Sequence, residues 1–351
     1  MKSMMTSRER VLSVFKGKLP DRVPWMEGIT ENKIATAVCG EPINVKWEVS
    51  PAGFPVQSGR ELAQEQIKVN KVFGKDNIQF SAFAPIFARR MTKTDDGSNV
   101  LIGDGMIRTF EDFEKIFRLP SPKDQEFVEK AREFIKYSEN YCTVACIRLG
   151  IGATLLSMGI EGFSYAMADD PDLIRAVHDA YASWTEEVLD VIHDCGFDIV
   201  WAFDDIAFNN GPIFSPAFYE EEILPREKRI IDKINVPVIT HSDGNMTPLL
   251  DIWLKLGQDG IHPIQPDVMD IEYVKEKYGR QVVLVGNIFM DDLVHKNPED
   301  IKTQVKDRIE RIGKDGRYII SSSNSLTDNM KPENVKAMIE AIEEYGYYET
   351  K

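Results

Sequence analysis

Short runs of apolar and β-branched residues recur along the chain, and segments with helical spacing separate most of them. This alternation is typical of strand–helix–strand units, which build parallel sheets. Eight such runs suit a closed barrel better than an open sheet. The sequence therefore predicts an α/β fold, a single (β/α)8 TIM barrel. The predicted strands are residues 23–27, 78–82, 143–149, 198–203, 237–241, 260–264, 282–287 and 318–322.

Several predicted helices carry start signals. Residues 170–194 have apolar side chains at helical spacing after the sequence DDPD. Ser215, followed by proline, opens another helix, which Pro225 should kink or interrupt. Asn297 and Lys331, each followed by proline, open the last two helices.

The first hundred residues are less regular. We expect a helix over residues 6–16 and a long loop, punctuated by prolines, over residues 42–59. No Gly/Ser linker or shift in composition divides the chain. Residues 1–351 are therefore predicted to form one domain with an N-terminal elaboration.

Charge and cysteine usage narrow the class of protein. The net charge of −15 argues against a nucleic-acid partner, because phosphate binding needs a basic surface. No apolar stretch approaches the roughly 20 residues of a membrane span, and no signal-peptide pattern is visible, so no membrane attachment is expected. Four cysteines do not make a disulfide framework, and Cys142 and Cys146 should be buried thiols on one strand face. We expect a cytoplasmic protein, with a homodimer as the default assembly.

Barrel enzymes carry their chemistry at the C-terminal ends of the strands. That rule selects the polar residues at the ends of the later predicted strands, which should converge at the barrel mouth. They are Asp204, Asp205, His241, Asp243, His262, Asp267, Asn287 and the segment 321–324.

Several segments resemble the uroporphyrinogen decarboxylase superfamily. Its opening helix and first strand are similar to SRERVLSVFKGKLPDRVPW, and its fourth-strand loop and helix are similar to DDIAFNNGPIFSPAFYEEEILP. Its later strands and closing helix are similar to HSDGNMTPLLDIWLKLGQDGIHPIQP, YGRQVVLVGNI and GRYIISSSNSL with KPENVKAMIEAI. The similar segments span nearly the whole chain in the same order, and the resemblance implies a barrel fold.

The superfamily contains at least two chemistries. Its decarboxylases carry an arginine-rich segment, of the type RQAGRYLPEY, that binds the carboxylates of the substrate. The corresponding stretch here, PWMEGITENKI, has no arginine and places Glu27 and Glu31 there instead. Bidentate arginine is the usual means of holding carboxylates, so cofactor-independent decarboxylation is kept as the alternative function.

The other branch comprises corrinoid-dependent methyltransferases that bind zinc. Members that methylate thiols use a His-x-Cys pair and a distant cysteine, whereas this chain has His241-Ser242-Asp243 and lacks both cysteines. Members that demethylate phenyl methyl ethers have a Glu, 14 residues, a second Glu, 20 residues and a His. Asp205, Glu220 and His241 match both spacings, with Asp in place of the first Glu.

The resemblance implies that Asp205, Glu220 and His241 hold a catalytic zinc ion with one open position. Zinc would stabilise the oxygen that gains charge as a methyl group leaves a methylated donor, a phenyl methyl ether, for the cobalt of a corrinoid. A separate corrinoid protein would supply that cofactor. Asp243 would handle protons or support His241, which makes His241 and Asp243 the candidate catalytic residues.

Candidate substrate-binding residues come from the same strand ends. Aromatic side chains there can form an apolar cup for an aromatic ring. The candidates are Asp204, Trp201, Phe203, His262 and Asn287.

Other interpretations stay open. Glu220 belongs to a run of three glutamates, and such runs usually form solvated faces. His241 can be a hydrogen-bonded structural histidine, and Asp204 and Asp205 can cap the loop that follows them. The chain can also be a methylcorrinoid-to-acceptor methyltransferase, or a corrinoid-binding protein without catalysis.

Overall fold

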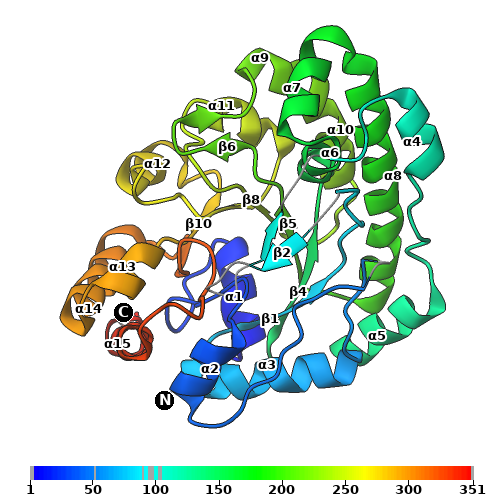
Figure 1. Ribbon diagram of the computed structural model, residues 1–351. Helices are drawn as coiled ribbons and strands as arrows, with labels where there is room; N and C mark the ends of the chain where they lie inside the picture. Colours follow the sequence, from blue (N-terminus) through cyan, green and yellow to red (C-terminus); the bar gives the residue numbers. More distant parts are fainter. Residues whose placement is uncertain (1–3, 51–52, 89–90, 94–98, 102–104, 349–351) are drawn as a thin grey trace.

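The parallel strands of the computed structural model form one curled sheet with helices around its outer face (Figure 1). The structure describes residues 4–50, 53–88, 91–93, 99–101 and 105–348. The sheet has the order β1-β4-β5-β8-β9-β10-β11, and all of its pairings are parallel. Its strands are β1 (Asn77–Ser81), β4 (Cys142–Ile147), β5 (Ile199–Phe203), β8 (Val238–His241), β9 (Gly260–His262), β10 (Val283–Val285) and β11 (Tyr318–Ile319).

Seven of the eight predicted runs are confirmed as strands of this sheet. The first, residues 23–27, is not a regular strand, because it contains a proline, which has no N–H to continue a ladder. It still hydrogen-bonds to the chain on both sides. Met26 N donates to Ile320 O at 3.0 Å, and Asp76 N donates to Trp25 O at 2.8 Å. This segment therefore lies between β11 and β1, the two edge strands of the curled sheet.

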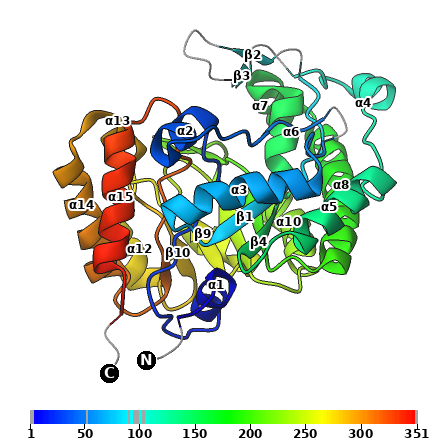
Figure 2. The same ribbon diagram turned by 90° about the horizontal axis from the view of Figure 1, so that it is seen from below.

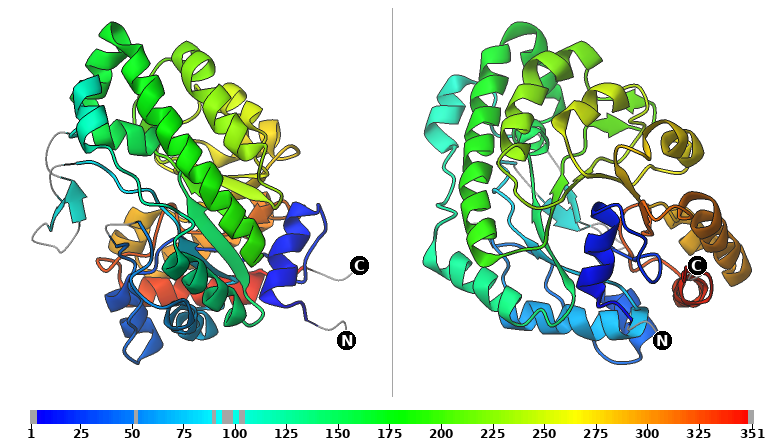
Figure 3. Two further views of the ribbon diagram at one scale, coloured as in Figure 1. Left: turned by 90° about the vertical axis from the view of Figure 1, so that its right-hand side faces the viewer. Right: turned by 180° about the vertical axis from the view of Figure 1, so that it is seen from behind.

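Helices surround the sheet in all three ribbon views (Figures 1 to 3). Within the described residues, none is both long enough and apolar enough to cross a bilayer. The α-helices are α1 (Ser7–Phe15), α2 (Asn32–Cys39), α3 (Gly59–Phe73), α4 (Phe110–Ile116), α5 (Gln125–Lys136), α6 (Ile151–Met158), α7 (Ile160–Asp169), α8 (Pro171–Cys195), α9 (Pro216–Phe218), α10 (Leu224–Ile231), α11 (Leu250–Trp253), α12 (Ile271–Tyr278), α13 (Met290–His295), α14 (Pro298–Asp307) and α15 (Pro332–Tyr345). Other turns and ribbons are η1 (Tyr219–Ile223), η2 (Leu254–Leu256), η3 (Arg308–Ile312), the pair β2 (Met91–Lys93) and β3 (Asn99–Leu101), and the pair β6 (Ala207–Phe208) and β7 (Gly211–Pro212).

The predicted helix starts are confirmed. Thr6 caps α1, Asp170 caps α8 and Asn297 caps α14 through side-chain oxygens that accept backbone N–H bonds. The predicted interruption near Pro225 is a π-helical turn, η1, which lies just before the proline. A wider turn relieves the clash between a proline ring and the carbonyl four residues earlier.

Strand side chains alternate between two cores, as the pleat of a strand requires. Side chains that point outward pack against the helices, and those that point into the curl form an inner core. Cys142 and Cys146 belong to the inner core as free, buried thiols, as predicted. Val11 and Val14 of α1 join it from the end of the sheet near both chain termini (Figure 2).

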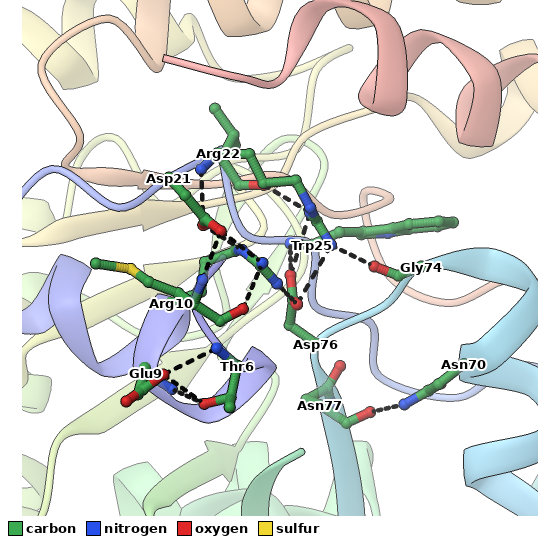
Figure 4. Close-up of polar contacts among 12 residues, drawn as sticks. Thr6, Glu9, Arg10, Asp21, Arg22, Trp25, Asn70, Gly74, Asp76 and Asn77 are labelled. Atoms are coloured by element: carbon green, nitrogen blue, oxygen red, sulfur yellow. Dashed lines mark hydrogen bonds and ion pairs between the residues drawn. The ribbon is translucent and has the colours of Figure 1, made fainter. Parts of the chain in front are cut away.

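A buried carboxylate joins α1 to the start of the sheet (Figure 4). Arg10 Nη1 donates to Asp76 Oδ1 at 2.6 Å, and Arg22 Nη2 donates to the same oxygen at 3.3 Å. Trp25 N donates to Asp76 Oδ2 at 2.9 Å. Because Asp76 is fully buried and both arginines are nearly so, this charge balance is protected from water.

Replacing Asp76 tests how much this network contributes. Asp76→Asn should lower the free energy of unfolding by about 3–5 kcal/mol, because it leaves buried guanidinium charge without its partner. Urea unfolding followed by circular dichroism measures the change. The control Glu111→Gln removes an exposed ion pair with Lys115 and should change stability by no more than about 1 kcal/mol. Equal losses in the two variants would contradict this account.

A buried histidine on α8 makes the fold sensitive to acid. His178 is 1% exposed, and its ring lies against Gly150, where an added Cβ would come within 2.9 Å of it. Burial, with a smaller effect from the charges of Arg226 and Arg229, lowers the pKa of His178 to about 3. The folded state therefore keeps this ring neutral over a pH range in which an unfolded chain protonates it.

The pH dependence of stability should reflect this difference. Between pH 6.5 and 3 the unfolded state binds the extra proton, so His178 makes the folded state less stable as the pH falls. Between pH 7 and pH 5 the free energy of unfolding should fall by about 2 kcal/mol less in His178→Phe than in the wild type. The exposed control His295→Phe should keep the wild-type loss. Urea unfolding at the two pH values is the measurement, and identical losses in all three proteins would exclude this role.

Candidate metal site and adjoining cavity

The C-terminal ends of three neighbouring strands bring predicted site residues together. Phe203 of β5 pairs in register with His241 of β8, and His241 pairs with His262 of β9. Asp205 and Asp243 each follow their strand by two residues. Because parallel strands end at one edge of a sheet, these side chains meet there.

Three of these side chains form a group with metal-ligand geometry. His241 Nε2 lies 3.3 Å from Asp205 Oδ1 and 3.6 Å from Asp243 Oδ1. The donor atoms all lie within 4.8 Å of one another. Two donors on a tetrahedral ion with bonds of about 2.1 Å would be about 3.4 Å apart. Asp243 Oδ1 is also buried without a hydrogen-bond partner among the described residues, so the group fits a divalent cation.

Glu220 is not part of this group, which corrects the predicted ligand set. Tyr219 and Ile223 are the buried residues of η1, so Glu220 points outward on the same turn. Its side chain is exposed and forms an ion pair with Lys255. The spacing of the motif is present, but Asp243 takes the place of Glu220 beside His241 and Asp205.

The electrostatics of the group favour a cation. Burial acts to raise the pKa of Asp205, but the hydrogen bond and charge of His241 outweigh it and lower that pKa. Burial acts to lower the pKa of His241, but Asp205, Asp243 and Asp204 raise it. Burial, with a smaller effect from Asp205, raises the pKa of Asp243. The carboxylates of Asp204, Asp205 and Asp243 surround the single imidazole of His241, so a cation bound beside them is stabilised.

His262 lies behind His241 and orients it. The Nδ1 atoms of the two rings are 2.6 Å apart. Burial, followed by the charge of His241, holds the pKa of His262 well below its ordinary value. A neutral His262 can accept the Nδ1 proton of His241, which leaves His241 Nε2 to face the carboxylates. His262 does not line the cavity described below, so its predicted contact with substrate is corrected to a positioning role.

A buried glutamate supports His262 from the far side. Ser321 Oγ lies 3.4 Å from His262 Nε2 and donates to Glu27 Oε2 at 3.3 Å. Ser322 N and Oγ also donate to Glu27, at 2.9 and 2.6 Å. Burial raises the pKa of Glu27 against these bonds. Contacts thus run from Glu27 through Ser321 and His262 to His241.

A cavity of about 520 Å³ opens in front of the three donor residues. Residues of the N-terminal segment, of α6 and of several strand ends line it. They are Gly28, Ile29, Gln79, Ser81, Phe83, Cys146, Arg148, Gly152, Leu155, Leu156, Ile160, Phe203, Asp204, Asp205, Ala207, Phe208, Ile213, His241, Asp243, Asn324 and Ser325.

Two predicted substrate contacts lie outside this cavity. Trp201 is fully buried in the inner core, with its ring centroid 5.2 Å from that of Phe203. Asn287 Nδ2 donates to Ile264 O at 2.7 Å, and its Oδ1 accepts from Arg308 Nε at 2.9 Å. Both predictions are corrected, because these side chains pack the fold behind the site. Phe203 does line the cavity.

Asp204 lines the cavity, but its oxygens are occupied. It accepts hydrogen bonds from Leu149 N, Gly150 N and Gly152 N at 2.5, 3.1 and 2.7 Å. Burial raises its pKa to about 6, against the effects of Arg148 and of these N–H groups. A Cβ at Gly152 would lie 2.4 Å from Asp204 Oδ1, so the contact requires glycine. Asp204 ties the start of α6 to the end of β5.

Several residues that line the cavity are not among the site residues that the sequence predicts. Arg148 directly follows β4, while Gln79 and Ser81 lie on β1. Asn324, the last residue of the predicted segment 321–324, also lines the cavity, and its Nδ2 donates to Asp243 Oδ2 at 2.5 Å. A usable signal was present, because Arg148 is the charged residue of the predicted strand 143–149 and stands near its C-terminal end.

Comparisons with known proteins agree with this architecture. Residues 105–345 match the family described as Uroporphyrinogen decarboxylase (URO-D). A uroporphyrinogen decarboxylase of Methylococcus capsulatus is 27% identical over 185 residues, 51% of each chain. One of Pseudoalteromonas translucida is 24% identical over 261 residues, 68% of this chain and 70% of its own. The chain thus spans about half the length of the first of these curated relatives.

Solved structures share the fold. A methyltransferase from Methanosarcina mazei has a TM-score of 0.77 at 17% identity, over 97% of this chain and 99% of its own. A B12-independent methionine synthase from Shewanella sp. W3-18-1, in complex with selenomethionine, has a TM-score of 0.54 at 13% identity, over 92% and 98%. At these identities the likeness concerns the fold alone.

The ligand assignment can be tested by metal binding. Asp243→Ala removes one of three donor atoms and should weaken binding of Zn²⁺ by about a hundredfold or more, beyond the loss typical of an outer-shell residue. Glu220→Gln is the control and should bind Zn²⁺ like the wild type. Competition with a chromogenic chelator measures both affinities. A larger loss in Glu220→Gln than in Asp243→Ala would restore the ligand set that the spacing implies.

Proposed function

Because this chain belongs to the uroporphyrinogen decarboxylase family, we propose that it carries out methyl transfer within that family. It is a zinc-dependent methyltransferase that moves a methyl group from a methylated donor, a phenyl methyl ether, to the cobalt of a corrinoid. A separate corrinoid protein carries that cofactor. A solved structure that shares its fold over nearly its whole length is that of a methyltransferase, which supports this choice.

The observation that carries the proposal is the group of Asp205, His241 and Asp243 at the cavity wall. One imidazole and two carboxylates are ordinary zinc ligands, and three protein ligands leave a position open. All three residues line the cavity, so an ether oxygen in the cavity would be next to a metal ion that they hold.

Several residues of the chain have separate roles in the proposed reaction. A bound zinc ion would supply Lewis-acid stabilisation of the ether oxygen as the methyl group leaves. His262 fixes the ring of His241, and Asn324 holds the second oxygen of Asp243. Phe203 packs beside His241, with ring centroids 4.9 Å apart, and offers an apolar face to an aromatic donor. Asp243 serves as a ligand in this scheme rather than as a proton carrier.

The assembly follows from the same proposal. The corrinoid protein docks over the mouth of the cavity, beside the exposed side chains of Ile29 and Phe208. Transfer from the corrinoid to an acceptor is the alternative direction for the same site. We propose a homodimer in the cytoplasm, where the four free cysteines stay reduced. We also propose that residues 23–27 complete a (β/α)8 barrel between β11 and β1.

Decarboxylation of a tetrapyrrole is the second candidate. It is favoured by the name of the curated relatives, uroporphyrinogen decarboxylase. A polycarboxylate would meet three aspartates in this cavity, and Arg148 is the one Arg or Lys among the described residues that line it. That charge balance favours the methyl ether.

The two candidates separate in one assay. The zinc-loaded protein, incubated with reduced cobalamin and a series of methoxybenzenes, should form methylcobalamin, which is followed by absorbance. His241→Ala should slow this reaction by about a hundredfold or more, since Lewis-acid stabilisation contributes several kcal/mol.

Glu220→Gln serves as the matched control and should keep the wild-type rate. A parallel incubation with uroporphyrinogen III, analysed by chromatography, should leave the substrate unchanged. Decarboxylated products, together with no methylcobalamin from any ether, would replace the proposed function by the second candidate.

A further inference from the structure

Arg148 is a half-buried cation that faces the cavity. It follows β4 directly, and its guanidinium carbon lies 4.7 Å from the ring centroid of Phe83. Its guanidinium makes no ion pair or hydrogen bond with another residue that the structure describes, whereas other half-buried arginines are paired, as Arg226 is with Asp179. An arginine with free donors beside a cavity can bind an acceptor there, because a guanidinium that leaves water needs hydrogen-bond acceptors.

The nearby carboxylates do not satisfy Arg148. Its charge acts to lower the pKa of Asp204 and that of Asp205. Asp204, however, is bonded to three backbone N–H groups. Asp205 is bonded to His241 and to the backbone of Asp243. The donors of Arg148 therefore remain available to a ligand.

The other residues that line the cavity indicate the chemistry of the ligand. Leu155, Leu156 and Ile160 form an apolar wall, and Phe83 and Phe203 add two rings. A ligand that satisfies all parts has an apolar body, an oxygen near the donor group and an anionic group near the guanidinium. The planar fork of arginine matches a carboxylate through two parallel hydrogen bonds.

We infer that Arg148 binds an anionic group, a carboxylate, of the substrate, and that the methyl donor is an anionic rather than a neutral aromatic ether. The assignment to a methyl ether rests on the proposed function. The anion subsite itself rests on the position of Arg148 alone. Arg148 is thus a specificity-determining residue that acts by contact with the substrate.

Equilibrium binding tests the subsite without catalysis. The full chain, freed of metal, is titrated calorimetrically with 4-methoxybenzoate and with its neutral isostere 4-methoxybenzamide. The wild type should bind the carboxylate at least about tenfold more tightly. Arg148→Gln should weaken binding of the carboxylate by about 10–100-fold and leave binding of the amide unchanged, since hydrogen bonds to charged groups are the strong ones.

Two further variants make the comparison specific. Arg148→Lys keeps the charge but not the fork and should retain part of the preference for the carboxylate. Arg60 also lies over an aromatic ring, 5.0 Å from the centroid of Tyr137, but is exposed and outside the cavity. Arg60→Gln is therefore the matched control and should bind both probes like the wild type.

Several outcomes would overturn the inference. They are wild-type binding of the two probes with equal affinity, no binding of either probe at millimolar concentration, and equal weakening of both by Arg148→Gln. Displacement of 4-methoxybenzoate by uroporphyrin in the wild type but not in Arg148→Gln would assign the anion to a tetrapyrrole and overturn the methyl ether assignment. Binding that depends on Arg148, without methylcobalamin formation, would instead refute the proposed function and leave the subsite standing.

Discussion

The parallel register of β5, β8 and β9 is the constraint on which the site depends. It sets Phe203, His241 and His262 side by side at one level of the sheet. The strand interiors are buried, so a shift of one residue would turn each of these side chains to the opposite face. Asp205 and Asp243 reach the same place only because their strands end together. The alignment of the strands therefore determines which side chains meet at the site.

Much of the fold follows from local sequence signals. Seven predicted runs form the sheet, and the capping residues Thr6, Asp170 and Asn297 begin their helices where the sequence places them. These signals are strong because they depend on neighbouring residues, such as a side-chain oxygen three positions before a free N–H. The first run failed as a strand for an equally local reason, the proline within it.

The site was predicted less completely, because it depends on which way side chains point. Strand ends gave Asp205, His241 and Asp243 correctly as neighbours, since position along a strand fixes direction. Glu220 failed because a matched spacing does not specify the face of a helical turn, and the burial of Tyr219 and Ile223 decides that face. His262 was predicted at the correct edge of the sheet but as a substrate contact. Only the contact between the Nδ1 atoms of His262 and His241 shows that it supports another ring.

The contacts from Glu27 to His241 give the N-terminal part of the chain a share in the site. The segment that matches the family begins at residue 105, yet Glu27 braces the imidazole pair, and Gln79, Ser81 and Phe83 form one side of the cavity. The matching region alone would hold the donor atoms, but it would lack one wall of the cavity and the glutamate that supports the two histidines. Any recombinant fragment trimmed to the matching region would thus lose the enclosure that decides which molecules enter, while keeping the atoms that would react with them.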